Sequence, residues 1–416
     1  MTEAQADARL LQLAETCLLP DRPADLGVAV SGGGDSMAML HLMAAAAPKA
    51  GWRLHAVTVD HGLRPEAAAE ARMVAAACAR LGVPHDALRW DHGAIKGNLQ
   101  DAARRARYGL IAGWARGRGI GDVAVAHTAD DVAETFLMEL AREAGIDGLS
   151  AMRAMWEAEG IRWHRPLLTA LRADLRVWLT DHGIGWAEDP SNTNPKYQRV
   201  RARQALVALA PLGIAADRIL GVAVNLLQAR QALDWAVAET GRRIAHEVAG
   251  EAILDRREFR LLPPEIARRM LVGALRWVSS AGYPPRGADV QRVLRAIHEG
   301  RDSTLAGCRI LTVDDKVRIA REPRAVQGLA TATDLRWDGR WIIEGPHAPG
   351  LEVRALGAEG LAQCEGWRDV GASRQALIVS PAVWRNRQLV AAPLAAPAAQ
   401  WRAQLANPLQ SALAAH

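Results

Sequence analysis

Residues 28–36 read Val28-Ala29-Val30-Ser31-Gly32-Gly33-Gly34-Asp35-Ser36, and this stretch decides the fold of the N-terminal part of the chain. The apolar run 27–30 predicts a strand, residues 31–36 a tight turn, and residues 37–47 a helix. Glycine lets the backbone adopt positive φ and approach a ligand closely. Successive N–H groups and a helix N-terminus form an anion site, to which Ser31 and Ser36 can add hydroxyl donors. The stretch therefore predicts a phosphate-binding turn.

The turn belongs to neither of two common phosphate-binding motifs. It lacks the Lys-Ser/Thr ending of a Walker A loop, and it is not G-x-G-x-x-G. An ordinary strand-to-helix turn is the alternative, but the serines and Asp35 favour a more specific role. The pattern S-G-G-x-D-S after a strand resembles the pyrophosphate (PP) loop of the N-type ATP pyrophosphatase superfamily. That resemblance implies cleavage of ATP between its α and β phosphates, with Asp35 as a candidate for organising Mg²⁺.

Strands and helices alternate outward from this turn. Further strands are expected at 54–59 and 123–126, and helices at 67–81, 98–116 and 130–142. This alternation predicts an α/β fold, with an N-terminal parallel sheet that carries helices on both faces, as in PP-loop ATPases. Ligands of such sheets bind beyond the carboxyl ends of the strands.

The character of the sequence changes near Pro211. Helices are expected at 216–247, 264–277 and 288–298, then a hairpin at 304–321 that turns at Asp314-Asp315. Residues 341–393 contain short strand-like pieces, and the tail from residue 391 is expected to be loosely ordered. We therefore predict a catalytic domain at 1–212, a mostly helical module at 213–325 and a small mixed α+β domain at 326–416.

Composition narrows the class of protein. The net charge of +5 permits a polyanionic partner without requiring one. The four cysteines lie far apart without a C-x-x-C pair, which favours reduced, mostly buried thiols over disulfides or a zinc site. Since the sequence shows neither a secretory signal nor a long apolar run, we expect a cytoplasmic protein with no membrane association.

Polar residues follow two of the predicted strands. Asp130, Asp131 and Glu134 follow the strand at 123–126, and the last two share a helix face because they are three residues apart. These carboxylates could hold Mg²⁺ or the ammonium group of a lysine substrate, although acids are also favoured at any helix N-terminus. His61 and His127 each follow a strand, and a structural role is the alternative for both.

Six segments resemble the tRNA(Ile)-lysidine synthase family over about residues 25–210. Besides the turn, they are VDHGLR at 59–64, NLQ at 98–100 with ARRARY at 103–108, HTADDVAET at 127–135, GLSAM at 148–152 with RPLL at 165–168, and EDPSN at 188–192 with YQRVRAR at 197–203. The chain departs from the usual family pattern at Thr128, at Glu143-Ala144 and at Val200. A weaker resemblance covers residues 381–385.

The resemblance implies a two-step reaction. ATP adenylates the C2 oxygen of the wobble cytidine in an isoleucine tRNA with a CAU anticodon, and free L-lysine then displaces AMP to give lysidine. Amino-acid charging of the tRNA thereby changes from methionine to isoleucine. The helical module and the C-terminal domain would bind the tRNA, the latter at the acceptor arm. A homodimer is left open as the oligomeric state.

The resemblance also implies roles for particular residues. ATP would be bound by Ser31, Gly32, Gly33, Gly34, Asp35, Ser36, Asp60 and His61. Catalysis or lysine binding would fall to His127, Asp130, Asp131 and Glu134, and Mg²⁺ to Asp35 and Asp131. Phosphates of ATP or tRNA would meet Arg104, Arg107, Arg199 and Arg203.

Three other functions are alternatives. A tRNA thiolase of the same superfamily would need cysteines to carry sulfur or a cluster, and the chain has no C-x-x-C pair. An amide-forming synthetase would carry a glutaminase domain or channel, whereas only 26 residues precede the first strand. A tRNA-binding protein with an inactive ATP site is disfavoured by the intact turn and acids.

Overall fold

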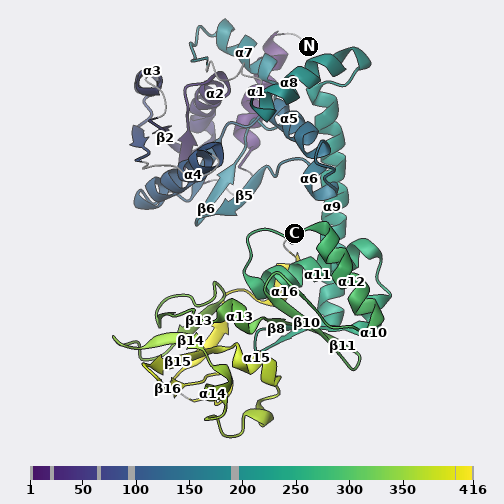
Figure 1. Cartoon of the computed structure of the whole chain (residues 1–416). Coiled ribbons are helices and arrows are strands. Elements are labelled where there is room, and N and C mark those ends of the chain that lie inside the picture. Colours follow the sequence, from purple (N-terminus) through teal and green to yellow (C-terminus); the bar gives the residue numbers. More distant parts are fainter. Residues whose placement is uncertain are drawn as a thin grey trace. The chain divides into compact units, whose positions relative to one another are not determined.

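The computed structural model describes residues 3–18, 23–62, 67–91, 99–188, 196–398 and 400–414. These residues form two compact units, Met1–Arg230 and Gln231–His416, drawn from purple to teal and from teal to yellow in Figure 1. Parts of three sequence motifs lie outside the described residues, namely Leu63, Arg64, Asn98 and 189–192. The division into three domains at 212 and 325 stays a prediction.

The first unit contains a six-stranded sheet in the order β3-β2-β1-β4-β6-β5. Five strands run parallel: β1 (Asp25–Ala29), β2 (Arg53–Asp60), β3 (His85–Arg89), β4 (Asp122–Val125) and β6 (Ile161–His164). An edge strand, β5 (Met155–Ala158), runs antiparallel to β6. The predicted α/β fold is confirmed. Strands β3, β5 and β6 were not predicted. Strands β3 and β5 are edge strands with no apolar run, and β6 is only four residues long.

Helices cover both faces of this sheet (Figure 1). Four helices share one hydrophobic cluster with it: α1 (Glu3–Thr16), α2 (Gly34–Ala50), α3 (Ala67–Leu81) and α7 (Arg172–Asp181). The other face packs on α4 (Leu99–Gly117). Successive side chains of β2 point to opposite faces of the sheet, so Leu54 and Ala56 join the first cluster and Val57 joins the second. A Cβ on Gly27 would lie 2.9 Å from Val123 Cγ2, so the central strand needs glycine there.

The remaining helical segments of the first unit follow β4 in the chain. They are α5 (Ala129–Leu140), α6 (Ile146–Leu149), α8 (Gln198–Leu209), the 3₁₀ turn η2 (Ala210–Leu212) and α9 (Ala216–Ile244), which contains the boundary between the units. Helix α8 packs on α5. Helix α5 ends two residues before the predicted Arg142, and Glu143 adopts φ +56° just beyond.

The second unit begins with an antiparallel sheet in the order β7-β8-β11-β10-β9. Its strands are β7 (Ala245–Val248), β8 (Glu251–Asp255), β9 (Ser303–Leu305), β10 (Cys308–Val313) and β11 (Lys316–Arg321). The sheet shares a core with α11 (Pro264–Ser279) and α12 (Gly287–Glu299), and α10 (Arg256–Arg260) follows β8. The predicted hairpin is confirmed as β10–β11, with Asp314 at φ +52° in the turn. Residues 245–248 form β7 instead of extending the predicted helix.

The C-terminal part of the second unit is a small α+β arrangement. A four-stranded sheet joins β12 (Thr331–Ala332), β14 (Glu352–Ala355), β15 (Pro381–Arg385) and β16 (Gln388–Ala391), and a ribbon joins β13 (Trp341–Glu344) to β17 (Arg402–Leu405). Short helical segments connect them: α13 (Pro323–Val326), α14 (Gly357–Leu361), η3 (Trp367–Val370) and α15 (Arg374–Ile378).

The expectation of a loosely ordered tail is wrong for the described residues 400–414. Trp401 is buried, and α16 (Leu409–Ala414) places Leu409 and Leu413 in the core beside α11. Because the tail is rich in alanine and proline, its sequence did not indicate that Trp401, Leu409 and Leu413 would be buried. The four cysteines are free thiols, three of them buried, as predicted.

Among the described residues, no single helix is both long and apolar enough to cross a membrane. Residues 198–212 and 216–244 are long and apolar enough only when taken together, and the two segments are bent by 99° relative to each other.

Candidate functional site

The glycine-rich turn connects the carboxyl end of β1 to the N-terminus of α2. Gly32 has φ +87°, a conformation that favours glycine, and its carbonyl accepts a hydrogen bond of 2.9 Å from Ala187 N. Gly33 occupies the N-cap position of α2 with no side chain to satisfy the first N–H groups. Donors therefore remain at the start of a 17-residue helix, as an anion site requires.

Ser36 holds the turn together. Its Oγ accepts a hydrogen bond from Ser31 N at 3.1 Å and donates to Gly33 O at 2.9 Å. A hydroxyl carries one hydrogen, so that of Ser36 is committed within the turn. Ser31 Oγ lies 3.2 Å from Ser36 Oγ, and because Ser31 is exposed its hydroxyl can rotate from that contact toward a ligand.

The backbone of the turn is open to close approach. A Cβ on Gly33 would meet nothing nearer than Ser31 Oγ at 3.8 Å, and one on Gly34 would make an ordinary 3.5 Å contact with Trp186. The fold itself therefore requires glycine at position 32 but not at 33 or 34. The two bare positions leave room for a bulky ligand such as a polyphosphate.

Residues from neighbouring strands reach the same edge of the sheet. Asp60 ends β2, and its Oδ1 accepts a hydrogen bond from Gly62 N at 2.8 Å. The ring of His61 meets that of Trp90 edge-on, with 5.9 Å between centroids. His127 follows β4 and Arg165 follows β6. The structure thus brings the predicted residues to the carboxyl edge of the parallel strands.

The departure at Thr128 has a structural explanation. Thr128 is the N-cap of α5 and forms a capping box with Asp131. Asp131 Oδ2 accepts hydrogen bonds from Thr128 N at 2.9 Å and from Thr128 Oγ1 at 3.0 Å. Threonine at this position therefore fixes one oxygen of the Asp131 carboxylate and orients the other.

The four predicted carboxylates surround Arg172, which the sequence analysis did not single out. Arg172 Nε lies 3.1 Å from Asp35 Oδ2, Nη1 lies 3.0 Å from Glu134 Oε1, and Nη2 lies 3.7 Å from Asp131 Oδ2. Asp130 Oδ2 accepts the backbone N–H of Arg172 at 2.7 Å. The sequence did not mark Arg172 as a site residue, because it is a single arginine at the start of a helix and belongs to no motif.

Helix α8 completes the cluster with two predicted arginines. Arg203 Nε donates to Glu134 Oε1 at 2.6 Å, and Arg199 Nη1 lies 3.7 Å from Asp131 Oδ1. The Glu134 side chain is 0% exposed, and within the described chain its Oε2 has no hydrogen-bond partner. One buried acceptor therefore remains in the cluster.

A second group is cationic. Arg104 and Arg107 of α4 lie over the Tyr108 ring, 5.3 and 5.4 Å from its centroid, and Arg165 lies 3.8 Å over the Trp156 ring. Arg165 Nε donates to His127 Nδ1 at 3.1 Å, so a neutral His127 carries its proton on Nε2. Such a group suits a phosphate.

Burial and neighbouring charges set the protonation of these groups. Burial, reinforced by Arg165, Arg104 and Arg107, lowers the pKa of His127 to about 3, so the imidazole is neutral at pH 7. Burial would raise the pKa of Asp131, but Arg172, His127, Arg199 and the Thr128 N–H together outweigh it and hold that pKa below its ordinary value.

The pKa values of Asp35 and Arg172 are both raised. Burial raises the pKa of Asp35 despite its contact with Arg172. Burial would lower the pKa of Arg172, but Asp35, Asp131 and Glu134 raise it instead.

The oxygen donors suit Mg²⁺ only together with a phosphate. Within the described residues, no group of three or more His, Cys, Asp or Glu side chains could hold a metal ion. Asp35 and Asp131 both face the guanidinium of Arg172. Mg²⁺ is commonly bound by one or two carboxylates plus substrate phosphates, and this donor set fits that mode.

Comparison with known proteins identifies the class and then the family. Residues 2–210 match the family described as the PP-loop domain. The chain is 49% identical over 383 residues to a tRNA(Ile)-lysidine synthase of Ruegeria pomeroyi, covering 92% of this chain and 91% of the relative. It is 40% identical over 303 residues to that of Hyphomonas neptunium, covering 70% and 80%. The chain belongs to the tRNA(Ile)-lysidine synthase family.

A solved structure also resembles the chain. It is that of a U34-tRNA thiolase from Methanococcus maripaludis, 14% identical, with a TM-score of 0.48 and coverage of 54% of this chain and 81% of that one. The names of the sequence relatives support the synthase reading over the thiolase reading. In addition, burial raises the pKa of Cys17 to about 12 and that of Cys78 to about 11, so neither is a ready thiolate.

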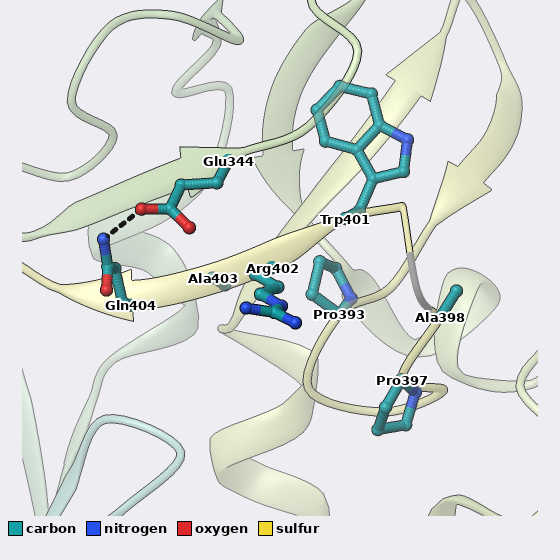
Figure 2. Close-up of a pocket in the computed structure, with 8 residues that line it drawn as sticks. All are labelled: Glu344, Pro393, Pro397, Ala398, Trp401, Arg402, Ala403 and Gln404. Carbon is teal, nitrogen blue, oxygen red and sulfur yellow. Dashed lines mark hydrogen bonds between the residues drawn. The ribbon is translucent and has the colours of Figure 1, made fainter.

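A separate pocket lies in the second unit. Its volume is about 520 Å³, and it is lined by Glu344, Pro393, Pro397, Ala398, Trp401, Arg402, Ala403 and Gln404. Figure 2 shows it beside the β13–β17 ribbon, where Gln404 Nε2 donates to Glu344 Oε1 at 2.6 Å. None of the predicted site residues lines it.

Proposed function

We propose that this protein uses ATP to join free L-lysine to C2 of the wobble cytidine in a CAU-anticodon isoleucine tRNA. One observation carries the proposal: a phosphate-binding turn and a buried carboxylate cluster meet at one point, through Arg172 between Asp35 and Glu134. The chain's similarity to tRNA(Ile)-lysidine synthases over most of its length supports the same reaction. Membership in this family makes the protein a tRNA-modifying enzyme.

The turn would hold the polyphosphate of ATP. The first N–H groups of α2 have no side-chain cap, a Cβ on Gly33 would meet nothing nearer than 3.8 Å, and the helix dipole favours an anion there. Asp35, at the second position of α2, would share Mg²⁺ with the phosphates. Mg²⁺ supplies charge neutralisation of the pyrophosphate leaving group when bound. Asp60 and His61, at the end of β2, would lie on the nucleoside side.

The carboxylate cluster would hold the lysine. Glu134 Oε2 is the buried acceptor without a partner in the described part of the chain, and an ammonium group would satisfy it. Asp131 presents Oδ1 toward Arg199 while Thr128 holds its other oxygen. Asp130 is committed to the first N–H of α7, so we assign it a structural part in the site.

The cationic group would meet the phosphate that becomes part of AMP. His127 is neutral and donates from Nε2, which suits hydrogen bonding to an oxygen rather than proton removal. Arg104 and Arg107 lie beside it without a carboxylate contact among the described residues. The second unit would bind the tRNA body, with its C-terminal part at the acceptor arm, and we expect the enzyme to act in the cytoplasm.

The proposal is tested with purified protein, ATP, Mg²⁺, labelled lysine and an unmodified CAU-anticodon isoleucine tRNA transcript. A methionine tRNA with the same anticodon is the control. We expect lysine in the first tRNA, none in the second, and AMP released in equal amount. AMP formation with some other acceptor, and no lysine incorporation, would retain ATP cleavage and reject the lysidine reaction.

A further inference from the structure

Arg172 occupies the centre of the site. Its guanidinium contacts acids that come from two separate elements, Asp35 from α2 and Glu134 from α5, at 3.1 and 3.0 Å. These two carboxylates are 99 residues apart in the sequence (134 − 35), so no local structure fixes their separation. A guanidinium is planar and rigid, and its fork holds two acceptors in a defined geometry.

The position of Arg172 is itself fixed from two sides. Its backbone N–H donates to Asp130 Oδ2 at 2.7 Å, so an α5 residue caps the start of α7, whose own N-cap Leu171 supplies no side-chain acceptor. Its side chain is 19% exposed and lies within 4 Å of four carboxylates. The residue therefore has little freedom to rotate away from the cluster.

We propose that Arg172 is a positioning residue that fixes Asp35, on the ATP side, relative to Glu134 and Asp131, on the lysine side. The inference rests on the proposed function and deepens it. In the proposed reaction AMP is attached to the C2 oxygen of the cytidine and the lysine amine attacks the neighbouring C2 carbon, so the two half-sites must be held in register. Among the described residues, Arg172 alone joins Asp35 to α5 through side-chain hydrogen bonds and ion pairs.

The test compares Arg172→Lys with the wild type. Lysine keeps the positive charge that the cluster needs for folding, but its single ammonium cannot hold two carboxylates in a planar fork. The control is Arg53→Gln, which removes a two-bond contact with Asp25 (2.9 and 2.6 Å) at the amino end of the sheet. Melting temperature, equilibrium ATP binding, and kcat and KM for lysine are measured for all three proteins.

The expected result for Arg172→Lys is a separation of kcat from binding. We expect a fall in kcat of about 100-fold, the loss that follows a misplacement of about 1 Å, with little change in ATP affinity or in KM for lysine. Arg53→Gln should keep the wild-type kcat. Wild-type kcat in a folded Arg172→Lys variant would overturn the proposal, and so would a change confined to KM for lysine, because Arg172 would then serve one half-site only.

Failure of the proposed function is distinguishable from failure of this inference. If the wild type incorporates no lysine into the isoleucine tRNA, the lysidine reaction itself is rejected. The contribution of Arg172 is then measured on tRNA-dependent pyrophosphate release, where an unchanged rate in Arg172→Lys overturns the inference.

Discussion

Removing the carboxylate of Glu134 should lower the stability of the first unit substantially. Glu134 Oε1 accepts from Arg172 Nη1 at 3.0 Å and from Arg203 Nε at 2.6 Å, and the side chain is 0% exposed. Glu134→Ala leaves two guanidinium groups beside a cavity without this acceptor. Breaking a buried ion pair is costly because the remaining charge stays desolvated.

The size of the effect follows from the exposure of the partners. Removing one member of a buried pair costs about 3–5 kcal/mol. Because Arg172 is 19% and Arg203 32% exposed, water can rehydrate them in part, so we expect about 3 kcal/mol, the lower end. A unit of 230 residues shifts by about 2–4 °C per kcal/mol, so its melting temperature should fall by about 6–12 °C.

The assay is thermal unfolding of Glu134→Ala beside Glu139→Ala, a matched change on the same helix. Glu139 is 27% exposed and pairs with Arg142 at 2.8 Å, an i,i+3 surface pair whose loss costs about 0–1 kcal/mol. Equal falls in melting temperature in the two variants would refute the claim that the ion pairs of Glu134 with Arg172 and Arg203 stabilise the first unit. Glu134→Gln should fall between them, because it keeps the acceptor and loses the charge.

Three further predictions concern the ATP turn and the neighbouring imidazole. Asp35→Ala should abolish ATP-dependent AMP formation, and retained turnover would contradict the role of Asp35. The melting temperature should not fall, because burial raises the pKa of Asp35 and its ionised form therefore costs stability above pH 3.8. Gly33→Ala should weaken ATP binding in calorimetry while the fold is kept, whereas Gly32→Ala should also destabilise, because only Gly32 has positive φ (+87°). His127 has its pKa lowered to about 3 in the folded state, so the unfolded state binds more protons below pH 6.5 and stability falls as the pH falls. Between pH 7.5 and 5 the wild type should lose about 2 kcal/mol more than His127→Gln, measured by urea unfolding, and parallel pH profiles would reject the buried neutral imidazole.

Much of the fold was predictable because its signals are local. The helix predicted at 67–81 has the same bounds as α3, and the hairpin turns at Asp314-Asp315 as expected. Elements without a strong period were missed. Strand β3 (HDALR) is a half-exposed edge strand, and the C-terminal α16 is held by Leu409 and Leu413 within an alanine-rich tail.

The sequence by itself determined the conformation of the glycine-rich turn. Gly32 must adopt positive φ, Ser36 must close the turn, and a helix must follow, and all three requirements lie within residues 31–36. It also determined where α5 begins, because Thr128 and Asp131 cap that helix through hydrogen bonds between residues three apart. Such short-range geometry is readable because few conformations satisfy it.

Only the tertiary structure decided which charges meet. Arg172 reaches Asp35 across 137 positions of sequence and Glu134 across 38, and Arg203 reaches Glu134 across 69. These contacts exist because the strand order puts β1 beside β4, so that the helices after both strands begin at one edge, where α7 and α8 arrive later in the chain. An arginine on a helix looks alike in sequence whether it faces water or a buried carboxylate, so the packing of whole elements selects the partner.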